Sequence, residues 1–473
     1  MLFAPELLLL TGSLVLFCLT LGEGKGKGKV AKNVALVLAI ASSILSFATL
    51  RLEGNLFFDA YRIDLFSQVF KFAMSVGLVA VLVLGSELKG VDDDVQPEYY
   101  LFMILSMVGL VMLVSSVELL TLFIALELSS YSLYLMVPMR SDHKGLRMQM
   151  EAGIKYILFG ALATAIMLYG MSFIFGLTGT TYLNALVPKL HGIASSPTAM
   201  LAIALFMSGF FYKLAVFPFH FWVPDVYQGA SNATTAFIAS IPKLGAVALL
   251  IRITTLIAPH AGETVVTMLM ILAVCSMFYG NLSALVQKDV KRMLGFSGIS
   301  HAGFVLLGLL TLDAAGFATS MYYIAGYLFM NLACFVVICK VSRDGENVLV
   351  EDLSGLYKRA PLLALTLLVG MMALAGIPPF VGFMGKFMLL TGALKAGHLT
   401  LVILAALNTA IAIYYYLSVV RVAFCSSPEE RPDVRIDFMT RFVSIALIVV
   451  IIVMGVAPKQ ILEIATSAVR TIL

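Results

Sequence analysis

The sequence predicts an all-α integral membrane protein with about fourteen transmembrane helices, and three observations support this fold class. Of the 473 residues, 61% are hydrophobic and only 12% are charged, whereas a soluble domain carries about 25% charged residues. The mean hydropathy is +1.00. Apolar runs of about 20 residues, the length needed to cross a bilayer, recur along the chain. We therefore expect most of the surface to meet lipid.

The apolar runs define the expected helices in order. They cover residues 2–22, 33–50, 64–86, 99–116, 118–138, 152–176, 199–222, 231–257, 264–286, 295–312, 314–339, 361–394, 398–424 and 440–458. The first run has neither a basic segment before it nor a small-residue cleavage site after it, so it is expected to be a retained helix. The longest connections, 177–198 and 340–360, are too short to form separate domains.

The distribution of lysine and arginine predicts the orientation. The connections after odd-numbered helices contain nineteen of these residues, and the opposite side contains six. The nineteen are Lys25, Lys27, Lys29, Lys32, Lys89, Arg140, Lys144, Arg147, Lys288, Lys291, Arg292, Lys340, Arg343, Lys358, Arg359, Arg421, Arg431, Arg435 and Arg441. The first side is therefore expected to be cytoplasmic, with both termini outside.

Six further basic residues fall inside the expected spans: Lys71, Lys155, Lys213, Lys243, Arg252 and Lys386. An ionisable group in the hydrocarbon is costly, and it usually has a function. Lys71 and Arg252 are placed where their side chains could extend to the membrane surface. The other four are candidates for a role inside the membrane.

A short internal repeat also occurs. Residues 214–218 resemble residues 374–378, and the pair 156–157 resembles 323–324. The similarity predicts two inverted five-helix repeats, helices 4–8 and 9–13, with helices 7 and 12 broken at proline; such paired breaks are typical of transport sites. The expected parts of the chain are 1–98 with helices 1–3, 99–257 and 264–425 with one repeat each, and 426–473 with helix 14.

Glu127 and Lys213 are the main candidates for proton transfer. Glu127 divides an apolar run near its middle, and Lys213 precedes the break at Pro218. Burial disfavours the charged form of a lysine, and a nearby carboxylate favours it. A change in the distance between the two groups could therefore make the lysine bind or release a proton. The alternative is a carboxylate that only stabilises helix packing.

Two more lysines lie next to proline in expected spans. Lys243 follows Pro242, and Lys386 follows the double break Pro378-Pro379. Proline leaves backbone carbonyls without their helical hydrogen bonds, and in lipid these need water or polar partners. Water at such points could connect the lysines. Lys155, near the start of helix six, could either pass protons laterally or extend to the surface.

His220 and His301 are candidate relay groups, because imidazole titrates near neutral pH, although packing roles are equally open. The five cysteines form no CxxC pair and are read as small hydrophobic residues. There is no basic stretch with interleaved aromatic residues, so nucleic acid is not an expected partner. We expect no redox cofactor and no metal in this chain.

Four segments carry a family resemblance. They are FYKLAVFPFHFWVPDVYQGA at 211–230, LFIALEL at 122–128, KDVKRMLGFS at 288–297 followed by His301, and AGIPP at 375–379 followed by Lys386. Together they resemble subunit N of proton-pumping NADH–quinone oxidoreductase (bacterial complex I), one of the antiporter-like subunits. The resemblance extends from about Tyr99 to Phe424. The sequence departs from the family pattern at 231–233, where the family usually has a Pro-Thr-Pro-like turn.

The resemblance implies a function and a set of partners. Glu127 and Lys213 would form the pump pair, Lys243 the central relay and Lys386 the distal site. The complex would use NADH, FMN, Fe–S clusters and quinone in other subunits, and this chain would contact membrane-arm subunits of types A, H, J, K, L and M. The location implied is the bacterial inner membrane. A subunit of a cation/proton antiporter or membrane-bound hydrogenase is the alternative, and a non-conducting scaffold a third.

Overall fold

A computed structural model describes all residues except 23–25, 143, 144, 146, 192, 194, 195, 258–262 and 428–430. Lys25 and Lys144, two of the basic residues counted above, lie outside the described residues. Within these limits the chain is almost entirely helical. Thirteen helices are long and apolar enough to cross a membrane. With the shorter pair α15 and α16, which follow one another along the expected twelfth span, they confirm the prediction of about fourteen crossings.

The helices follow the expected order. The first half contains α1 (Ala4–Leu21), α2 (Lys27–Ala48), α3 (Leu65–Leu84), α4 (Gln96–Ser115), α5 (Leu119–Met136), α6 (Met148–Thr178), α8 (Pro197–Leu214), α9 (Trp222–Gly229) and α10 (Asn232–Ile257). The second half contains α11 (Glu263–Ala284), α12 (Val290–Leu309), α13 (Ala314–Val341), α15 (Pro361–Ala375), α16 (Val381–Lys395), α17 (Leu399–Cys425) and α18 (Phe438–Val456).

Several short elements were not predicted from hydropathy. β1 (Gly54–Leu56) and β2 (Tyr61–Ile63) form an antiparallel hairpin before α3, and α7 (Leu183–His191) lies in a long connection. Among the described residues, three 3₁₀ turns (Asp93–Val95, Val137–Met139 and Val350–Leu353) and α14 (Leu356–Arg359) occupy other connections. The chain also continues past α18 as α19 (Pro458–Arg470), where a single last helix had been expected. These elements are too short or too polar to give a membrane-span signal.

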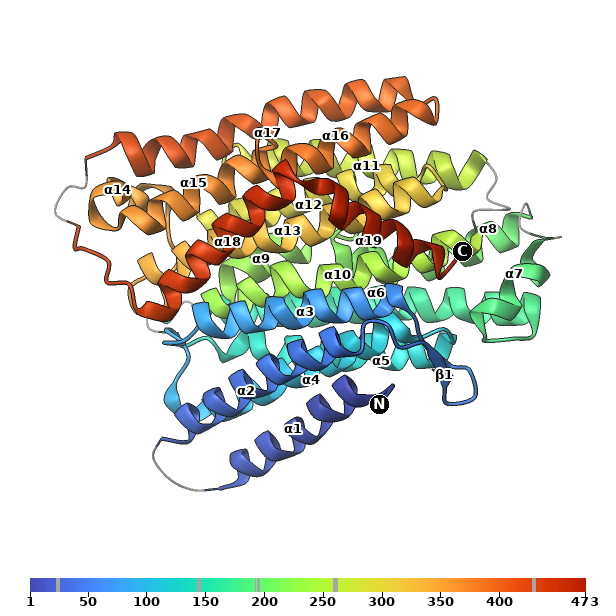
Figure 1. The fold of residues 1–473 in the computed structure, drawn as a ribbon, viewed down its shortest axis with the longest axis horizontal. Helices are drawn as coiled ribbons and strands as arrows, with labels where there is room; N and C mark the ends of the chain where they lie inside the picture. The colour runs from blue at the N-terminus through green and yellow to red at the C-terminus, as the bar shows by residue number, and fades with distance from the viewer. Residues whose placement is uncertain are drawn as a thin grey trace.

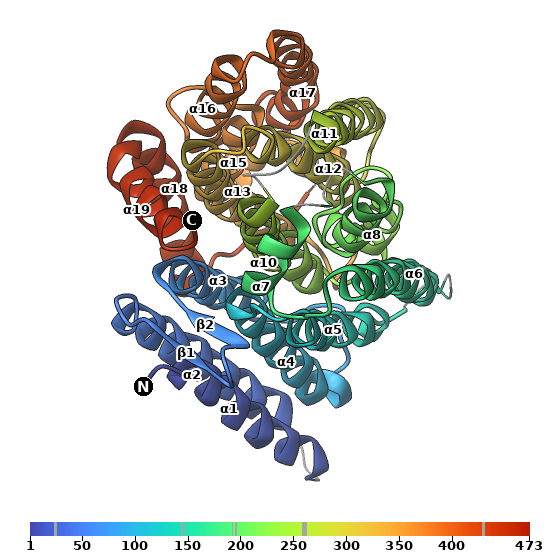
Figure 2. The ribbon, with the colours of Figure 1, turned by 90° about the vertical axis from the view of Figure 1, so that its right-hand side faces the viewer.

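Figure 1 shows the long helices running roughly side by side, with both termini and the β hairpin toward one end. We call this end the terminal face. α14 and the connection from α17 to α18 lie at the opposite end. Viewed along the bundle in Figure 2, α10 lies near the middle. Its span segment is completely buried, so an element with almost no lipid contact holds the two halves together.

The two breaks share one backbone arrangement. α8 ends when Ala215 adopts a positive φ of 68°, and α15 ends when Gly376 adopts a φ of 86°. The amide of Val216 donates to the carbonyl of Phe211, and the amide of Ile377 donates to the carbonyl of Met372. Both bonds are of the kind that ends a helix at a C-cap. The broken helices 7 and 12 are thus confirmed. The backbone geometry pairs Ala215 with Gly376, whereas the sequence similarity pairs residue 215 with residue 375. The two registers therefore differ by one residue. The division into inverted repeats stays a prediction.

The turn before α10 departs from the family pattern but is well ordered. The amide of Thr234 donates to Ser231 Oγ, and the two hydroxyls lie 2.7 Å apart. Ser231 therefore caps the first turn of α10, a position for which serine is favoured.

Candidate functional site

Glu127 and Lys213 lie close together but form no direct ion pair among the described residues. Lys213 Nζ donates to Ser130 Oγ at 3.0 Å and to Ser129 Oγ at 3.3 Å, both on α5. Glu127, also on α5, accepts a hydrogen bond of 2.8 Å from Thr164 on α6. Its charge nevertheless acts on Lys213 across the short distance between them. The carboxylate is 6% exposed and the lysine 3%, so both are taken out of water.

The position of Lys213 is fixed by the break that follows it. Lys213 occupies the last turn of α8, where the helix carbonyls favour a cation. The indole of Trp222, the first residue of α9, donates to the carbonyl of Tyr212 at 3.1 Å. The hydroxyl of Tyr212 in turn donates to the carbonyl of Tyr156 at 2.9 Å. The break is therefore held on both sides.

Lys243 lies in the buried middle of α10. Its Nζ is 3.3 Å from the carbonyl of Gly298 on α12 and 3.3 Å from the hydroxyl of Tyr327 on α13. It also lies 5.0 Å from the centre of the Tyr327 ring, a cation–π arrangement. The partners are neutral, and the side chain is 1% exposed.

His301 connects the helices of the second half. Its Nδ1 is 2.6 Å from the Tyr323 hydroxyl, and its Nε2 is 3.1 Å from the Tyr416 hydroxyl. The charges of both Lys243 and Lys386 act on this ring. His301 thus lies between the central and distal lysines, with a hydroxyl on each nitrogen. This arrangement fits the relay role inferred from the sequence.

Lys386 uses the carbonyls that the second break leaves free. From α16 its Nζ donates to the carbonyls of Leu374 and Ala375, each at 3.1 Å, in the last turn of α15. It also lies 4.9 Å from the centre of the Phe304 ring. A cation at a helix C-terminus is favourable, and Lys386 has no carboxylate partner in the described part of the chain.

His220 lies in the first break and differs from His301. Neither of its ring nitrogens has a hydrogen-bond partner among the described groups, and the residue is fully buried. Its ring packs 4.2 Å from that of Tyr279 and 4.4 Å from that of Phe221, measured between centres. The structure gives it no connection to the lysines.

Lys155 is at the surface end of the site. Its Nζ forms ion pairs with Asp225 at 2.6 Å and with Glu151 at 2.7 Å, and Arg292 pairs with the other oxygen of Asp225 at 2.6 Å. Partial burial raises the pKa of Asp225, but the hydrogen bonds from Lys155 and Arg292 outweigh it, so that the pKa is lowered overall. Of the two alternatives raised for Lys155, its position fits a surface cluster.

The remaining site residues form a row across the bundle. In Figure 2, α5 and α8 lie on one side of α10, and α12, α13 and α16 lie on the other. Lys213 bonds to α5, the helix of Glu127. On α12, Gly298 contacts Lys243, His301 follows one turn later, and Phe304, nearly one turn farther, contacts Lys386. Hydroxyl groups adjoin four of these five side chains directly, those of Glu127, Lys213, Lys243 and His301. Such a row can bind protons at several points within the membrane.

The expectation that Lys71 and Arg252 extend to the membrane surface is wrong. Lys71 is 0% exposed and Arg252 is 4% exposed. Lys71 pairs with Glu6 at 2.6 Å, and Arg252 pairs with Asp64 at 3.0 Å. Hydropathy could not reveal this, because it does not say which way a side chain points. The signal that was missed is the polar spacing along α3, described below.

No group of three or more His, Cys, Asp or Glu residues suited to a metal ion occurs among the described residues. The five cysteines are all unpaired.

Comparisons with known proteins place the chain in a family. The transmembrane family described as NADH:quinone oxidoreductase/Mrp antiporter matches residues 116–412. NADH-quinone oxidoreductase subunit N 2 of Opitutus terrae is 51% identical over 471 residues, 99% of this chain and 98% of that protein. The corresponding protein of Solidesulfovibrio magneticus is 44% identical over 464 residues, 98% of this chain and 97% of that protein.

A solved structure has the same fold. A chain of respiratory complex I from Thermus thermophilus superposes with a TM-score of 0.85 at 31% identity, covering 98% of this chain and 100% of that one. The matched family model and these relatives cover the helices that carry the row from Glu127 to Lys386. The chain therefore belongs to the NADH:quinone oxidoreductase/Mrp antiporter transmembrane family.

Proposed function

We propose that this chain is a proton-translocating membrane subunit of an NADH–quinone oxidoreductase of the bacterial inner membrane. One observation carries the proposal: Lys213, Lys243 and Lys386 are at most 4% exposed and form no ion pair among the described residues. A buried lysine without a carboxylate is costly. Three of them in one row have no evident packing role, and this argues against a non-conducting scaffold.

The neutral partners suit a lysine that changes its protonation state. A hydroxyl can accept a hydrogen bond from an ammonium and can donate one to a neutral amine. Ser129 and Ser130 offer such groups to Lys213, and Tyr327 offers one to Lys243. A carboxylate in direct contact would instead hold the lysine charged. The row can therefore release protons as well as bind them.

Glu127 would act as the group that tunes Lys213. With no direct contact between them, the lysine is free of the carboxylate in the conformation described here. A rearrangement of α5 or α8 that brought the two together would favour the ammonium, and its reversal would release the proton. Lys243, His301 and Lys386 would carry protons farther, whereas Lys155 would serve at the surface and His220 would line the first break.

Electron transfer would take place in other subunits, which would hold FMN and Fe–S clusters and react with NADH and quinone. The partners proposed are the other membrane-arm subunits, of types A, H, J, K, L and M. A subunit of an Mrp-type antiporter is the second candidate, because a chain of the Mrp complex from Dietzia shares the fold with a TM-score of 0.86 at 21% identity. Full-length relatives named subunit N favour the first.

The test is NADH-driven proton uptake in inverted membrane vesicles from strains carrying Glu127→Gln, Lys213→Ala, Lys213→Arg or the double change. We expect each to lose most of its proton uptake, and the double variant to be no worse than the more severe single one, because residues that act as one unit are not additive. Lys213→Arg is the sharpest variant, since a guanidinium does not deprotonate.

Each variant is first checked for the amount of assembled complex. Uptake equal to that of the unmodified protein in assembled Lys213→Arg would contradict the proposal. Redox turnover by the purified chain alone would contradict the assignment of electron transfer to other subunits. Sodium/proton exchange without NADH would favour the antiporter.

A further inference from the structure

A line of polar side chains extends along the buried side of α3. Its members are Asp64, Ser67, Gln68, Lys71 and Ser75, which we call the α3 stripe. Spacings of three and four residues place them on one side of the helix. Each is at most 2% exposed. At 1.5 Å per residue the stripe is about 16 Å long, about half the thickness of the hydrocarbon core.

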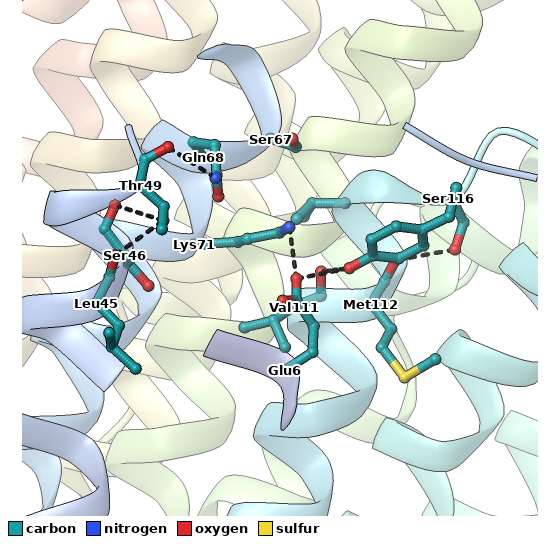
Figure 3. Close-up of polar contacts among 12 residues, drawn as sticks. Glu6, Leu45, Ser46, Thr49, Ser67, Gln68, Lys71, Val111, Met112 and Ser116 are labelled. Atoms are coloured by element: carbon teal, nitrogen blue, oxygen red, sulfur yellow. Dashed lines mark hydrogen bonds and ion pairs between the residues drawn. The ribbon is translucent and has the colours of Figure 1, made fainter. Parts of the chain in front are cut away.

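A carboxylate from another helix meets the stripe at Lys71. Glu6 of α1 lies 2.6 Å from Lys71 Nζ, and both side chains are fully buried (Figure 3). The hydroxyl of Tyr61 donates to the same oxygen, Glu6 Oε1, at 2.7 Å. Burial and the Glu6 carboxylate raise the pKa of Tyr61 well above its ordinary value, so this hydroxyl keeps its proton and positions Glu6.

Several polar atoms around this pair have no hydrogen-bond partner among the described groups, although they are buried. They are Glu6 Oε2, Ser46 Oγ and Gln68 Oε1, together with Arg252 Nε farther along. Figure 3 shows Ser46 and Gln68 on the side of Lys71 away from Met112. An unpartnered buried polar atom is costly, and in native proteins such atoms are normally bound to ordered water. Ordered water would supply the partners that these atoms lack.

The stripe reaches the terminal face at one end. Asp64 forms an ion pair with Arg252 at 3.0 Å and lies 3.6 Å from Arg62. The side chain of Arg62 is 38% exposed, whereas that of Asp64 is 3% exposed. A polar route thus leads from the surface at Arg62, through Asp64, to Lys71.

The other end of the stripe is Ser75, at the level of the central part of α3. Ser75 bonds to Ser42 of α2, with 3.0 Å between the hydroxyl oxygens. Gly77, two residues farther and on the opposite side of α3, packs against Ile241 and Leu328, so closely that a Cβ there would lie 3.2 Å and 3.0 Å from their side chains. Ile241 is two residues from Lys243, and Leu328 is next to Tyr327. The side of α3 opposite the stripe thus packs against the helices that carry this part of the row.

We propose that the α3 stripe is a hydrated half-channel for protons, in which Glu6 and Lys71 form an additional proton-binding site between the layer of Lys243 and the terminal face. The inference rests on the proposed function of the chain. It assigns a role to the N-terminal helices, which lie outside the residues that match the family model.

The proton balance of the site is simple. In the resting pair Lys71 is an ammonium and Glu6 a carboxylate, with no net charge. A proton that arrives on Glu6 gives the acid beside the ammonium, with a net charge of +1. Release of one proton toward Asp64 restores the ion pair. No covalent bond other than those to the moving proton changes.

A structural role makes a different prediction. Replacing a buried ion pair by neutral groups of similar size is often harmless to stability, whereas removing one partner leaves an unpaired charge. The double variant Glu6→Gln/Lys71→Met therefore separates the two roles. If the pair only supports packing, the double variant recovers what each single variant loses. If the pair binds protons, it recovers assembly but not pumping.

The experiment measures proton uptake per NADH oxidised in inverted vesicles for Glu6→Gln, Lys71→Met, the double variant and Tyr61→Phe. The control is Thr366→Val, which removes a buried hydroxyl that bonds only within its own helix. We expect the double variant to lose at least about half of its uptake per NADH, because a positioned proton-transfer group is removed. Tyr61→Phe should lose part of it, and Thr366→Val none.

Uptake per NADH equal to that of Thr366→Val in assembled double variant and in Tyr61→Phe would overturn the inference. If the double variant does not assemble, Tyr61→Phe decides, because it removes one hydroxyl and no charge. Glu127→Gln, measured in parallel, separates the two proposals. If the stripe variants have normal proton uptake and Glu127→Gln does not, only the half-channel is contradicted. If the stripe variants and Glu127→Gln all have normal uptake, the proposed function is contradicted as well.

Discussion

Two kinds of buried lysine occur in this protein, and their partners distinguish them. Lys243 is held by a carbonyl, a hydroxyl and an aromatic ring, whereas Lys71 is paired with a carboxylate. The neutral partners of Lys243 stabilise its ammonium only weakly. Because none of them is charged, loss of the proton leaves no unpaired charge. Lys71 and its carboxylate keep both charges until a proton arrives. The arrangement around Lys243 therefore favours loss of a proton, whereas the pair of Lys71 and its carboxylate favours uptake of one.

Gly298 is the residue that lets Lys243 reach its carbonyl partner. A Cβ at this position would lie 2.5 Å from Lys243 Nζ and 3.0 Å from the Tyr327 hydroxyl. We expect Gly298→Ala to displace the ammonium and to lower NADH-driven proton uptake about tenfold, comparable to the loss of a hydrogen bond to a charged group. The amount of assembled complex should not change, because the atom that must move is the end of a flexible side chain.

Gly392→Ala is the matched control for this prediction. The nearest atom to a Cβ there is 3.9 Å away, in the side chain of Thr311, and alanine favours a helix. Uptake reduced equally in both variants would show that the loss does not depend on Lys243.

The individual residues differ in how visible they are in the sequence. Glu127 and Lys213 interrupt long apolar runs, so their burial could be inferred before the structure. Glu6 could not, because a carboxylate in the first turn of a first helix also suits a position at the membrane surface. The contact of Lys213 with Ser129 and Ser130 was also unpredictable, since it depends on the rotation of α5 about its axis.

At the scale of elements, the two broken helices use equivalent turns for lysines in different places. Lys213 precedes the first turn within α8, whereas Lys386 follows the second turn and reaches back to the carbonyls of α15. In each case the cation is at the C-terminal end of a half-helix, where the helix dipole favours it. The turns fix where these cations lie along the membrane normal.

α9 is anchored at its surface end by Asp225, which joins Lys155 of α6 and Arg292 of α12. We expect Asp225→Asn to lower stability by about 1 kcal/mol at pH 7, a modest value because the three side chains are about one third exposed. The pKa of Asp225 is lowered in the folded protein, so this contribution is present above its ordinary value of 3.8 and lost as the pH falls through the lowered value.

The measurement is thermal unfolding of the purified chain in detergent at pH 7 and at a pH below about 3. The difference between the two proteins should shrink at the lower pH. A constant difference would mean that the carboxylate charge does not contribute.

The elements were predictable to different degrees. Spans of about 20 apolar residues were evident, and the prolines indicated both breaks. The exact register of the breaks could not be predicted, because it depends on which residue takes a positive φ. Alanine, the residue at 215, rarely adopts this conformation. α19 was missed because its polar residues interrupt the hydropathy signal.

For the whole molecule, the predicted orientation can be tested at two exposed residues, one at each end of the bundle. Lys358 of α14 is exposed at the end opposite the terminal face, whereas Asp59 is exposed in the hairpin at the terminal face. In a variant without native cysteines, we expect Lys358→Cys to be labelled by an impermeant maleimide only in inverted vesicles, and Asp59→Cys only in intact spheroplasts. The reverse pattern would contradict the orientation inferred from the charges.

The length of the α3 stripe has a consequence for the response to membrane voltage. A potential of 100 mV changes the energy of one elementary charge by about 2.3 kcal/mol across the whole hydrocarbon core. Water along a stripe of about 16 Å would carry the potential of the terminal-face side inward to Ser75 and confine the voltage drop to the remaining half. The part of the membrane beyond Ser75 would then experience about twice the average field, and a proton would do its electrical work over about half the usual distance.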